Sequence, residues 1–157
     1  MSTPDSHLDP ATHARVFVDD IIPESGLNET TSQARPRAII LGGQPGAGKG
    51  GLARAARDEL SKDAVTIDPD ELRDFHPNAE RLQSVHPYTW SGDTHPDASQ
   101  WANELKELAV QQKKNIIIDT TLGHGDSAVR LVNSLQDAGY EVAASTAGLA
   151  WQLGIRL

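Results

Sequence analysis

The sequence predicts an α/β fold, in which one mainly parallel β-sheet is covered by helices on both faces. Helical patterns separate four short apolar stretches that are expected to be strands, at 38–42, 64–68, 115–119 and 140–145. A glycine-rich turn, GGQPGAGKGG at 42–51, joins the first strand to the first helix. Because helical crossovers make successive strands run parallel, the carboxyl ends of the strands and this turn should share one edge of the sheet.

The first 34 residues lie before this alternation and are predicted to be an N-terminal arm, with one domain over 35–157. The arm is polar and contains several prolines, but ATHARVFVDDII at 11–22 favours a short helix. We expect the arm to be partly ordered, where its apolar side chains find cover: Val16, Val18, Ile21 and Ile22.

Four helices are predicted between and after the strands, at 51–61, 69–75, 98–114 and 127–139. Asp68 is the expected N-cap of the second helix, with Pro69 at its first position, and His76-Pro77 should end it. The third helix is the longest, and its predicted buried stripe consists of Trp101, Leu105, Leu108 and Ala109. The fourth should end at Gly139.

Composition excludes several classes of protein. A chain of 157 residues with 38% hydrophobic content fits one domain, and the absence of cysteine excludes disulfides and thiolate metal sites. No apolar run approaches the roughly 20 residues that span a membrane, and the N-terminus lacks a signal-peptide pattern, so a cytoplasmic protein is expected. A net charge of −8 argues against a nucleic-acid partner. The histidines at 76, 86, 95 and 124 fit surface loops better than a zinc site.

The glycine-rich turn has the spacing G-x-x-x-x-G-K, typical of loops that cradle nucleotide phosphates. Backbone N–H groups and the helix N-terminus favour anions there, and Lys49 can reach the outer phosphates. The residue after Lys49, usually Ser or Thr, would ligate Mg²⁺, but here it is Gly50. The alternative is a turn without a ligand. The predicted nucleotide-binding residues are Gly43, Gln44, Pro45, Gly46, Ala47, Gly48, Lys49, Gly50 and Gly51.

Three pieces in order, LGGQPGAGKG, VTIDPDELRDFHP and NIIIDTT, the last after a helix with HPDASQWANEL, resemble the zeta toxin family. These bacterial toxins act as kinases of UDP-N-acetylglucosamine. The resemblance covers about residues 35–145. It implies a three-layer phosphate-loop kinase-like fold, ATP with Mg²⁺, a sugar hydroxyl of the nucleotide sugar as acceptor, and a small antitoxin partner.

The resemblance also assigns roles to single residues. Lys49 would hold the β- and γ-phosphates, and Asp70 would be the catalytic base for the acceptor hydroxyl. Asp119 would position Mg²⁺ or substrate, and Thr121 and Asn103 would lie on the substrate side. Without the resemblance, Asp70 could simply be an acid in the first turn of a helix, and Asp119 a solvent-facing acid at a strand end.

The sequence also departs from the family pattern. Asn103 stands where the family usually has Glu, and Gly123 stands where it has Arg. Gly50 stands where the hydroxyl of a Ser or Thr usually ligates Mg²⁺. We expect the fold to be incomplete at its C-terminus, without the arginines of the family's later segments. Residues 145–157 are a poor match for a segment that would complete this fold. The alternative function is therefore a truncated or degenerate domain that binds nucleotide or antitoxin without catalysis. A related nucleotide or antibiotic kinase is a third option.

Overall fold

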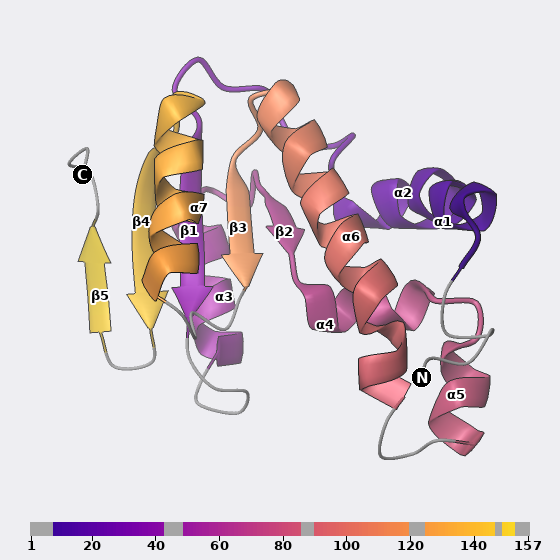
Figure 1. Ribbon diagram of the computed structural model, residues 1–157. Coiled ribbons are helices and arrows are strands. Elements are labelled where there is room, and N and C mark those ends of the chain that lie inside the picture. The colour runs from indigo at the N-terminus through magenta and orange to yellow at the C-terminus, as the bar shows by residue number, and fades with distance from the viewer. Residues whose placement is uncertain (1–7, 43–48, 86–89, 120–124, 147–148, 153–157) are drawn as a thin grey trace.

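The computed structural model describes residues 8–42, 49–85, 90–119, 125–146 and 149–152. Figure 1 shows a sheet flanked by helices. The first elements are α1 (Pro10–Val16), a π-helical turn η1 (Phe17–Ile21), α2 (Ile22–Ser25), β1 (Arg37–Gly42), α3 (Lys49–Glu59) and β2 (Val65–Ile67). The next are α4 (Pro69–Leu72), a 3₁₀ turn η2 (Arg73–Phe75), α5 (Ala79–Val85) and α6 (Trp90–Gln111). The last are β3 (Ile116–Asp119), α7 (Gly125–Asp137), β4 (Glu141–Thr146) and β5 (Leu149–Gln152).

The sheet has the order β2-β3-β1-β4-β5. The first four strands in this order pair in parallel, with Ile39 of β1 opposite Ile117 of β3 and Ala143 of β4. The predicted parallel sheet is confirmed, and each predicted strand lies within two residues of its expected bounds. Beyond the four predicted strands, Leu149–Gln152 forms an antiparallel strand, β5, beside β4.

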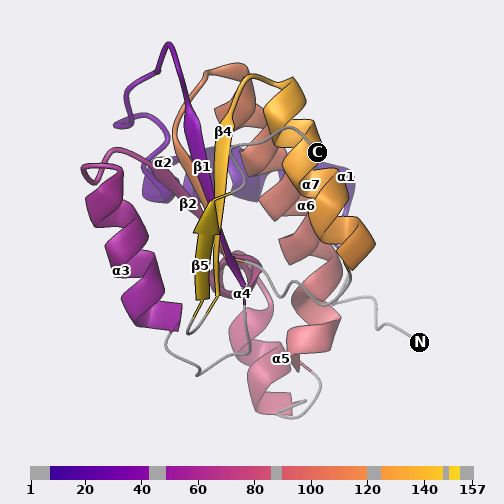
Figure 2. The same ribbon diagram turned by 90° about the vertical axis from the view of Figure 1, so that its left-hand side faces the viewer.

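Helices cover both faces of the sheet, as Figure 2 shows, with α3 on one side and α6 and α7 on the other. Alternate residues of the strands face the two layers. The core beneath α3 contains Ile39, Leu41, Ala56, Leu60 and Ile117. The larger core beneath α6 and α7 includes Ala38, Ile40, Val65, Ile67, Trp101, Leu105, Ile116 and Leu135. The three-layer arrangement expected from the sequence is therefore present.

The N-terminal segment packs into the larger core. Val16, Ile21 and Leu27 are each only 1% exposed, so the expected cover for Val16 and Ile21 is confirmed. The expectation for Val18 was wrong, because this side chain is 58% exposed. The π-helical turn at Phe17–Ile21 adds a residue to the turn, which rotates the helical face between Val16 and Ile21.

A buried polar cluster joins α1 to α6. The two ring nitrogens of His13 lie 2.9 Å from Oδ1 of Asp97 and 2.5 Å from Oε1 of Glu104. The indole Nε1 of Trp101 donates to the backbone oxygen of His13 at 3.1 Å, and the two rings stack with centroids 5.0 Å apart. Trp101 is therefore held by both apolar packing and a hydrogen bond.

His76 belongs to the same cluster, which corrects the expectation of surface loop histidines. It is 2% exposed, its ring meets Trp101 edge-on at 6.5 Å, and its Nδ1 accepts the backbone N–H of Asn78. Its Nε2 lies 3.7 Å from Asp97 Oδ2. His95 lies within α6 and not in a loop, whereas residues 86 and 124 fall outside the described ranges.

Lys113, two residues after the end of α6, has a φ of 56°, in the left-handed region that suits glycine. The backbone N–H of the next residue, Lys114, donates to the oxygen of Ala109 at 2.9 Å, which closes the helix. We expect Lys113→Gly to raise the free energy of unfolding by about 0.5–1 kcal/mol, because glycine removes the steric cost of this conformation. Urea denaturation measures the effect. Lys113→Ala is the control, and an equal gain from alanine would contradict the backbone explanation.

Candidate functional site

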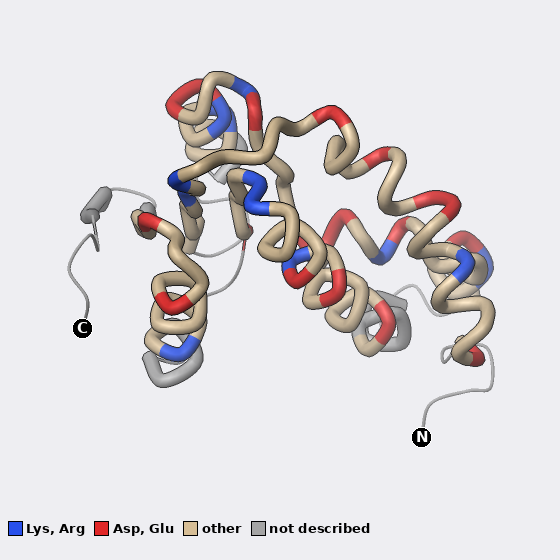
Figure 3. The backbone as a smooth tube through the Cα atoms, turned by 90° about the horizontal axis from the view of Figure 1, so that it is seen from above, with Lys and Arg blue, Asp and Glu red and all other residues tan. Residues whose placement is uncertain are grey.

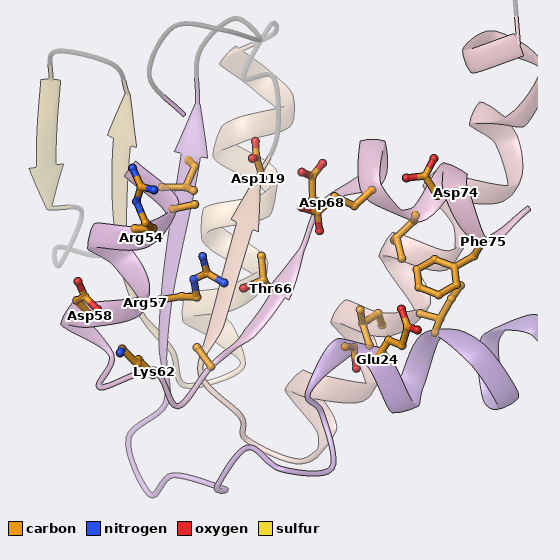
Figure 4. A pocket seen from close by; sticks show the side chains of 18 residues that line it. Glu24, Arg54, Arg57, Asp58, Lys62, Thr66, Asp68, Asp74, Phe75 and Asp119 are labelled. Atoms are coloured by element: carbon orange, nitrogen blue, oxygen red, sulfur yellow. The ribbon is translucent and has the colours of Figure 1, made fainter. Parts of the chain in front are cut away.

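A groove of about 1350 Å³ runs along the α3-facing side of β2. Figure 4 shows the residues that line it. Ala64 and Thr66 form its floor, because Val65 and Ile67 point to the opposite face and belong to the larger core. One wall is formed by α3, and the other by α2, α4 and η2, with Leu72 and Phe75 as apolar contacts.

The end of the groove at the carboxyl edge of the sheet is acidic, and its lining includes Asp68, Glu71, Asp74 and Asp119. The pairing of Ile67 with Ile118 places the next residues, Asp68 and Asp119, side by side at the ends of neighbouring parallel strands. Figure 4 shows both carboxylates at the top of the groove. Because ligands of such sheets bind beyond the carboxyl ends of the strands, this end is the candidate active site.

Asp68 caps a helix at this end and also lies beside a second carboxylate. Its carboxylate accepts the backbone N–H of Asp70 at 2.9 Å, so the predicted cap of α4 is confirmed. Burial, followed by the negative charge of Asp119, raises the pKa of Asp68 from 3.8 to about 6, although the N–H of Asp70 opposes this increase. A bound cation would relieve the repulsion between these two carboxylates.

The acidic end fits a hard divalent cation such as Mg²⁺, which prefers carboxylate oxygens. Within the described ranges, no three side chains of His, Asp or Glu gather closely enough to hold a metal by themselves. Mg²⁺ usually keeps several water ligands and takes others from substrate phosphates, so one or two carboxylates suffice. Asp68 was predicted only as a helix cap, and the strand order is what places it beside Asp119.

Asp68→Asn should abolish one source of pH dependence in stability. Between about pH 4 and 6 the folded chain keeps the Asp68 proton that the unfolded chain has lost, so stability falls as pH rises. Asparagine still caps a helix. We expect the variant to match the native chain near pH 4, and above pH 6 to be more stable by on the order of 1 kcal/mol, discounted for solvent screening.

The measurement is the midpoint of urea unfolding across this pH range. Asp68→Ala is the matched control, because it removes the charge and the cap together and should lose about 1 kcal/mol of capping at every pH. A difference between the native chain and Asp68→Asn that does not change with pH would contradict the assigned pKa.

The other predicted residues are distributed as follows. Asp70 is 59% exposed and forms an ion pair with Arg73 at 2.7 Å, and it is not among the residues that line the groove. Asn103 is exposed on α6 and is also outside that lining. β1 ends at Gly42 and α3 begins at Lys49, so the expected strand and helix flank the glycine-rich sequence. Gly51, in the first turn of α3, has open space where a Cβ would lie. Residues 43–48, Thr121 and Gly123 lie outside the described ranges.

Comparison with known proteins identifies the family. The sequence model of the zeta toxin family matches residues 24–151, which is most of the chain. The chain belongs to the zeta toxin family. The zeta toxin of Streptococcus pyogenes is 30% identical over 110 residues, covering 68% of this chain and 37% of that protein. Toxin PezT of Streptococcus pneumoniae serotype 4 is 32% identical over 111 residues, covering 71% of this chain and 44% of PezT.

Solved structures support the same assignment. A structure from the PezAT chromosomal toxin-antitoxin system of Streptococcus pneumoniae superimposes with a TM-score of 0.83 at 25% identity, over 92% of this chain and 59% of that one. A putative kinase from Chloroflexus aurantiacus, with a TM-score of 0.52 and 17% identity, covers 72% of this chain and 59% of its own, and it shows the fold alone. The phosphate-loop kinase-like fold expected of a zeta toxin is thus confirmed. The present chain spans less than half the length of the curated relatives that it matches. None of its described helices is both long and apolar enough to cross a membrane.

Proposed function

We propose that this zeta toxin family chain is an ATP-dependent kinase domain that phosphorylates a sugar hydroxyl of UDP-N-acetylglucosamine. In the proposal it acts in the cytoplasm as the toxin of a toxin-antitoxin system, with a small antitoxin protein as its partner. The observation that supports it is the position of the acidic pair Asp68 and Asp119, at the same sheet edge where β1 ends and α3 begins at Lys49. Nucleotide phosphates and a metal would meet at this edge.

The proposed roles follow from position and charge. Lys49 and the backbone of 43–48 would hold the phosphates of ATP, and Asp70 would accept the proton of the acceptor hydroxyl. The ion pair of Asp70 with Arg73 does not rule out this role, since catalytic contacts often form only when substrate is bound. Asp68 and Asp119 would hold Mg²⁺, whose chemistry is to neutralise charge on the transferred phosphoryl group.

A second candidate function is binding of nucleotide or antitoxin without catalysis. Gly50 offers Mg²⁺ no hydroxyl, and Asn103 and Gly123 lack the charged groups that the family uses on the acceptor side. Backbone donors and Lys49 do not require a side chain at Gly50, so nucleotide affinity should persist when turnover is poor. The two candidates therefore differ in turnover and not in ATP binding.

The test is calorimetric titration of ATP, together with ADP release in the presence and absence of UDP-N-acetylglucosamine. We expect ATP binding with only a small gain from Mg²⁺, and acceptor-dependent ADP release well below the roughly 1 s⁻¹ at the low end of ordinary kinases. Release that does not depend on UDP-N-acetylglucosamine would exclude this acceptor. Absence of ATP binding would exclude both candidate functions.

Gly50→Thr should restore a hydroxyl ligand for Mg²⁺ and raise both the metal dependence of ATP affinity and the rate of ADP release. Gly50→Ala is the matched control, because it adds a Cβ to the same position without an oxygen. Equal effects of threonine and alanine would show that the helix, and not the metal, responded to the change.

A further inference from the structure

Arg54 places a positive charge at the acidic end of the groove. It lies on α3, five residues after the helix begins at Lys49, which is roughly 7.5 Å along the helix axis. Side chains of a helix lean toward its N-terminus, so the long Arg54 side chain runs back toward the carboxyl edge of the sheet. Figure 4 shows this side chain level with Asp68 and Asp119. The groove therefore has a guanidinium on its α3 wall at the height of the acidic pair.

Arg54 makes no ion pair within the part of the chain that the structure describes, although acidic side chains line the same end of the groove. By contrast, Arg37 pairs with Glu59, and Arg73 pairs with Asp70. The chain has a net charge of −8, and Figure 3 shows acidic positions along several of its helices. An exposed guanidinium that faces a groove in such a chain is available to an anionic ligand.

A nucleotide at this edge of the sheet needs positive charge in addition to that of Lys49. Asp68, Glu71 and Asp119 line this end of the groove and would repel the phosphates of ATP. Bound Mg²⁺ would neutralise only part of the phosphate charge, and Gly50 offers the metal no hydroxyl. The γ-phosphate would lie nearest the acidic pair, because it would share the metal there. Arginine suits this phosphate, because its planar guanidinium donates two parallel hydrogen bonds to phosphate oxygens.

We propose that Arg54 binds the γ-phosphate of ATP, opposite the acidic pair, and so holds the phosphoryl group that is to be transferred. The assignment rests on the proposed kinase function, because it takes ATP as the nucleotide. It adds a residue that lies outside the glycine-rich sequence. Arg57 is one turn further along α3, roughly 4.5 Å from Arg54 along the axis, and Figure 4 shows its side chain extending toward Thr66 on the groove floor. Arg57 should therefore not reach this phosphate.

ATP and ADP are the probes, each titrated by calorimetry into the full chain at about 0.15 M salt, with excess Mg²⁺ and again with a chelator. The ratio of the two affinities isolates the γ-phosphate, because ADP lacks it. The variants are Arg54→Gln and Arg54→Lys, with Arg57→Gln as the matched control on the same helix and Arg15→Gln as the remote control. Arg15 lies on α1, outside the groove lining. All three arginines are exposed, so the variants should fold, and thermal melting checks this.

We expect Arg54→Gln to weaken ATP binding by about tenfold or more and to leave ADP binding nearly unchanged, with Mg²⁺ and with the chelator alike. Arg54→Lys should lose less, because lysine keeps the charge but not the planar pair of donors. Both control variants should keep the native ratio of ATP affinity to ADP affinity.

Equal weakening of ATP and ADP binding in Arg54→Gln would overturn the assignment, since only net charge would then matter. An unchanged ATP affinity in Arg54→Gln, or the same change of ratio in Arg57→Gln, would also overturn it. A loss seen only with Mg²⁺ would assign the effect to the metal and would overturn the direct contact. Absence of ATP binding to the native chain would overturn the assignment together with the proposed function. ATP binding that depends on Arg54, without any ADP release, would support the assignment and exclude the kinase activity alone.

Discussion

Replacement of Trp101 by alanine is expected to lower the free energy of unfolding by about 3–5 kcal/mol, a large part of the stability of a domain this size. Trp101 is fully buried in the larger core, stacks on His13 and meets His76 edge-on. Its indole N–H also satisfies the backbone oxygen of His13. The variant therefore combines a large cavity with a buried acceptor that has lost this donor.

The measurement is chemical denaturation with hydrogen exchange of the α1 amides. Trp101→Phe is the control, because it keeps an aromatic ring and most of the volume but removes the N–H donor. We expect an intermediate loss from phenylalanine and faster exchange in α1 for both variants. If α1 exchange stayed at the native rate in Trp101→Ala, the N-terminal segment would be anchored by other contacts, such as those of Val16 and Ile21.

Asp70→Asn is expected to lower the rate of phosphoryl transfer by about a hundredfold or more, as the loss of a general base does in other enzymes. Asparagine keeps the size of the side chain and a hydrogen-bonding oxygen, so the first turn of α4 should be preserved. The apparent affinity for Mg²⁺ should not change, because Asp68 and Asp119, and not Asp70, would hold the metal. ADP release measured against Mg²⁺ concentration separates these two effects.

Asp68→Asn is the comparison, since it should weaken the dependence on Mg²⁺ and reduce the rate at low metal concentration. If native turnover is too slow to measure, both substitutions can be made together with Gly50→Thr. The opposite pattern, with normal turnover in Asp70→Asn and loss at every Mg²⁺ concentration in Asp68→Asn, would transfer the base role to Asp68. Its pKa of about 6 and its place in the groove make that a real alternative.

The sequence predicted the parallel strands well because they are buried on both faces and therefore read as short uninterrupted apolar runs, such as AIIL and IIID. It did not predict β5, because residues 149–152 form a strand through pairing with β4. The start of α6 was placed at 98 instead of Trp90, because Pro96 lies inside the helix and proline usually indicates a boundary. The burial of His76 depended on Trp101 and Asp97, which are more than 20 residues away in sequence.

The residues of the candidate site also differ in how far the sequence alone could predict them. Local spacing was sufficient to predict the cap at Asp68, since it depends on neighbours in the chain. The acidic pair required strand order, because Asp68 and Asp119 become neighbours only when β2 lies beside β3. The position of the basic residues in the groove could not be predicted from the sequence either. Arg54 and Arg57 have the pattern of ordinary exposed helical arginines, and they line a groove only because β2 forms its floor.

The strand order also determines when the sheet can begin to form during synthesis. Among the described strands, β1 pairs only with β3 and β4, and β2 pairs only with β3, so the first two strands made have no partner in each other. At ordinary translation rates, the interval between the end of β1 and the completion of β3 is roughly 4–15 s. Throughout it, the apolar run of Ala38–Leu41 has no strand to pair with, and unpaired apolar edges promote aggregation. During this interval, a ribosome-bound chaperone that covered the nascent chain would give the greatest protection against aggregation.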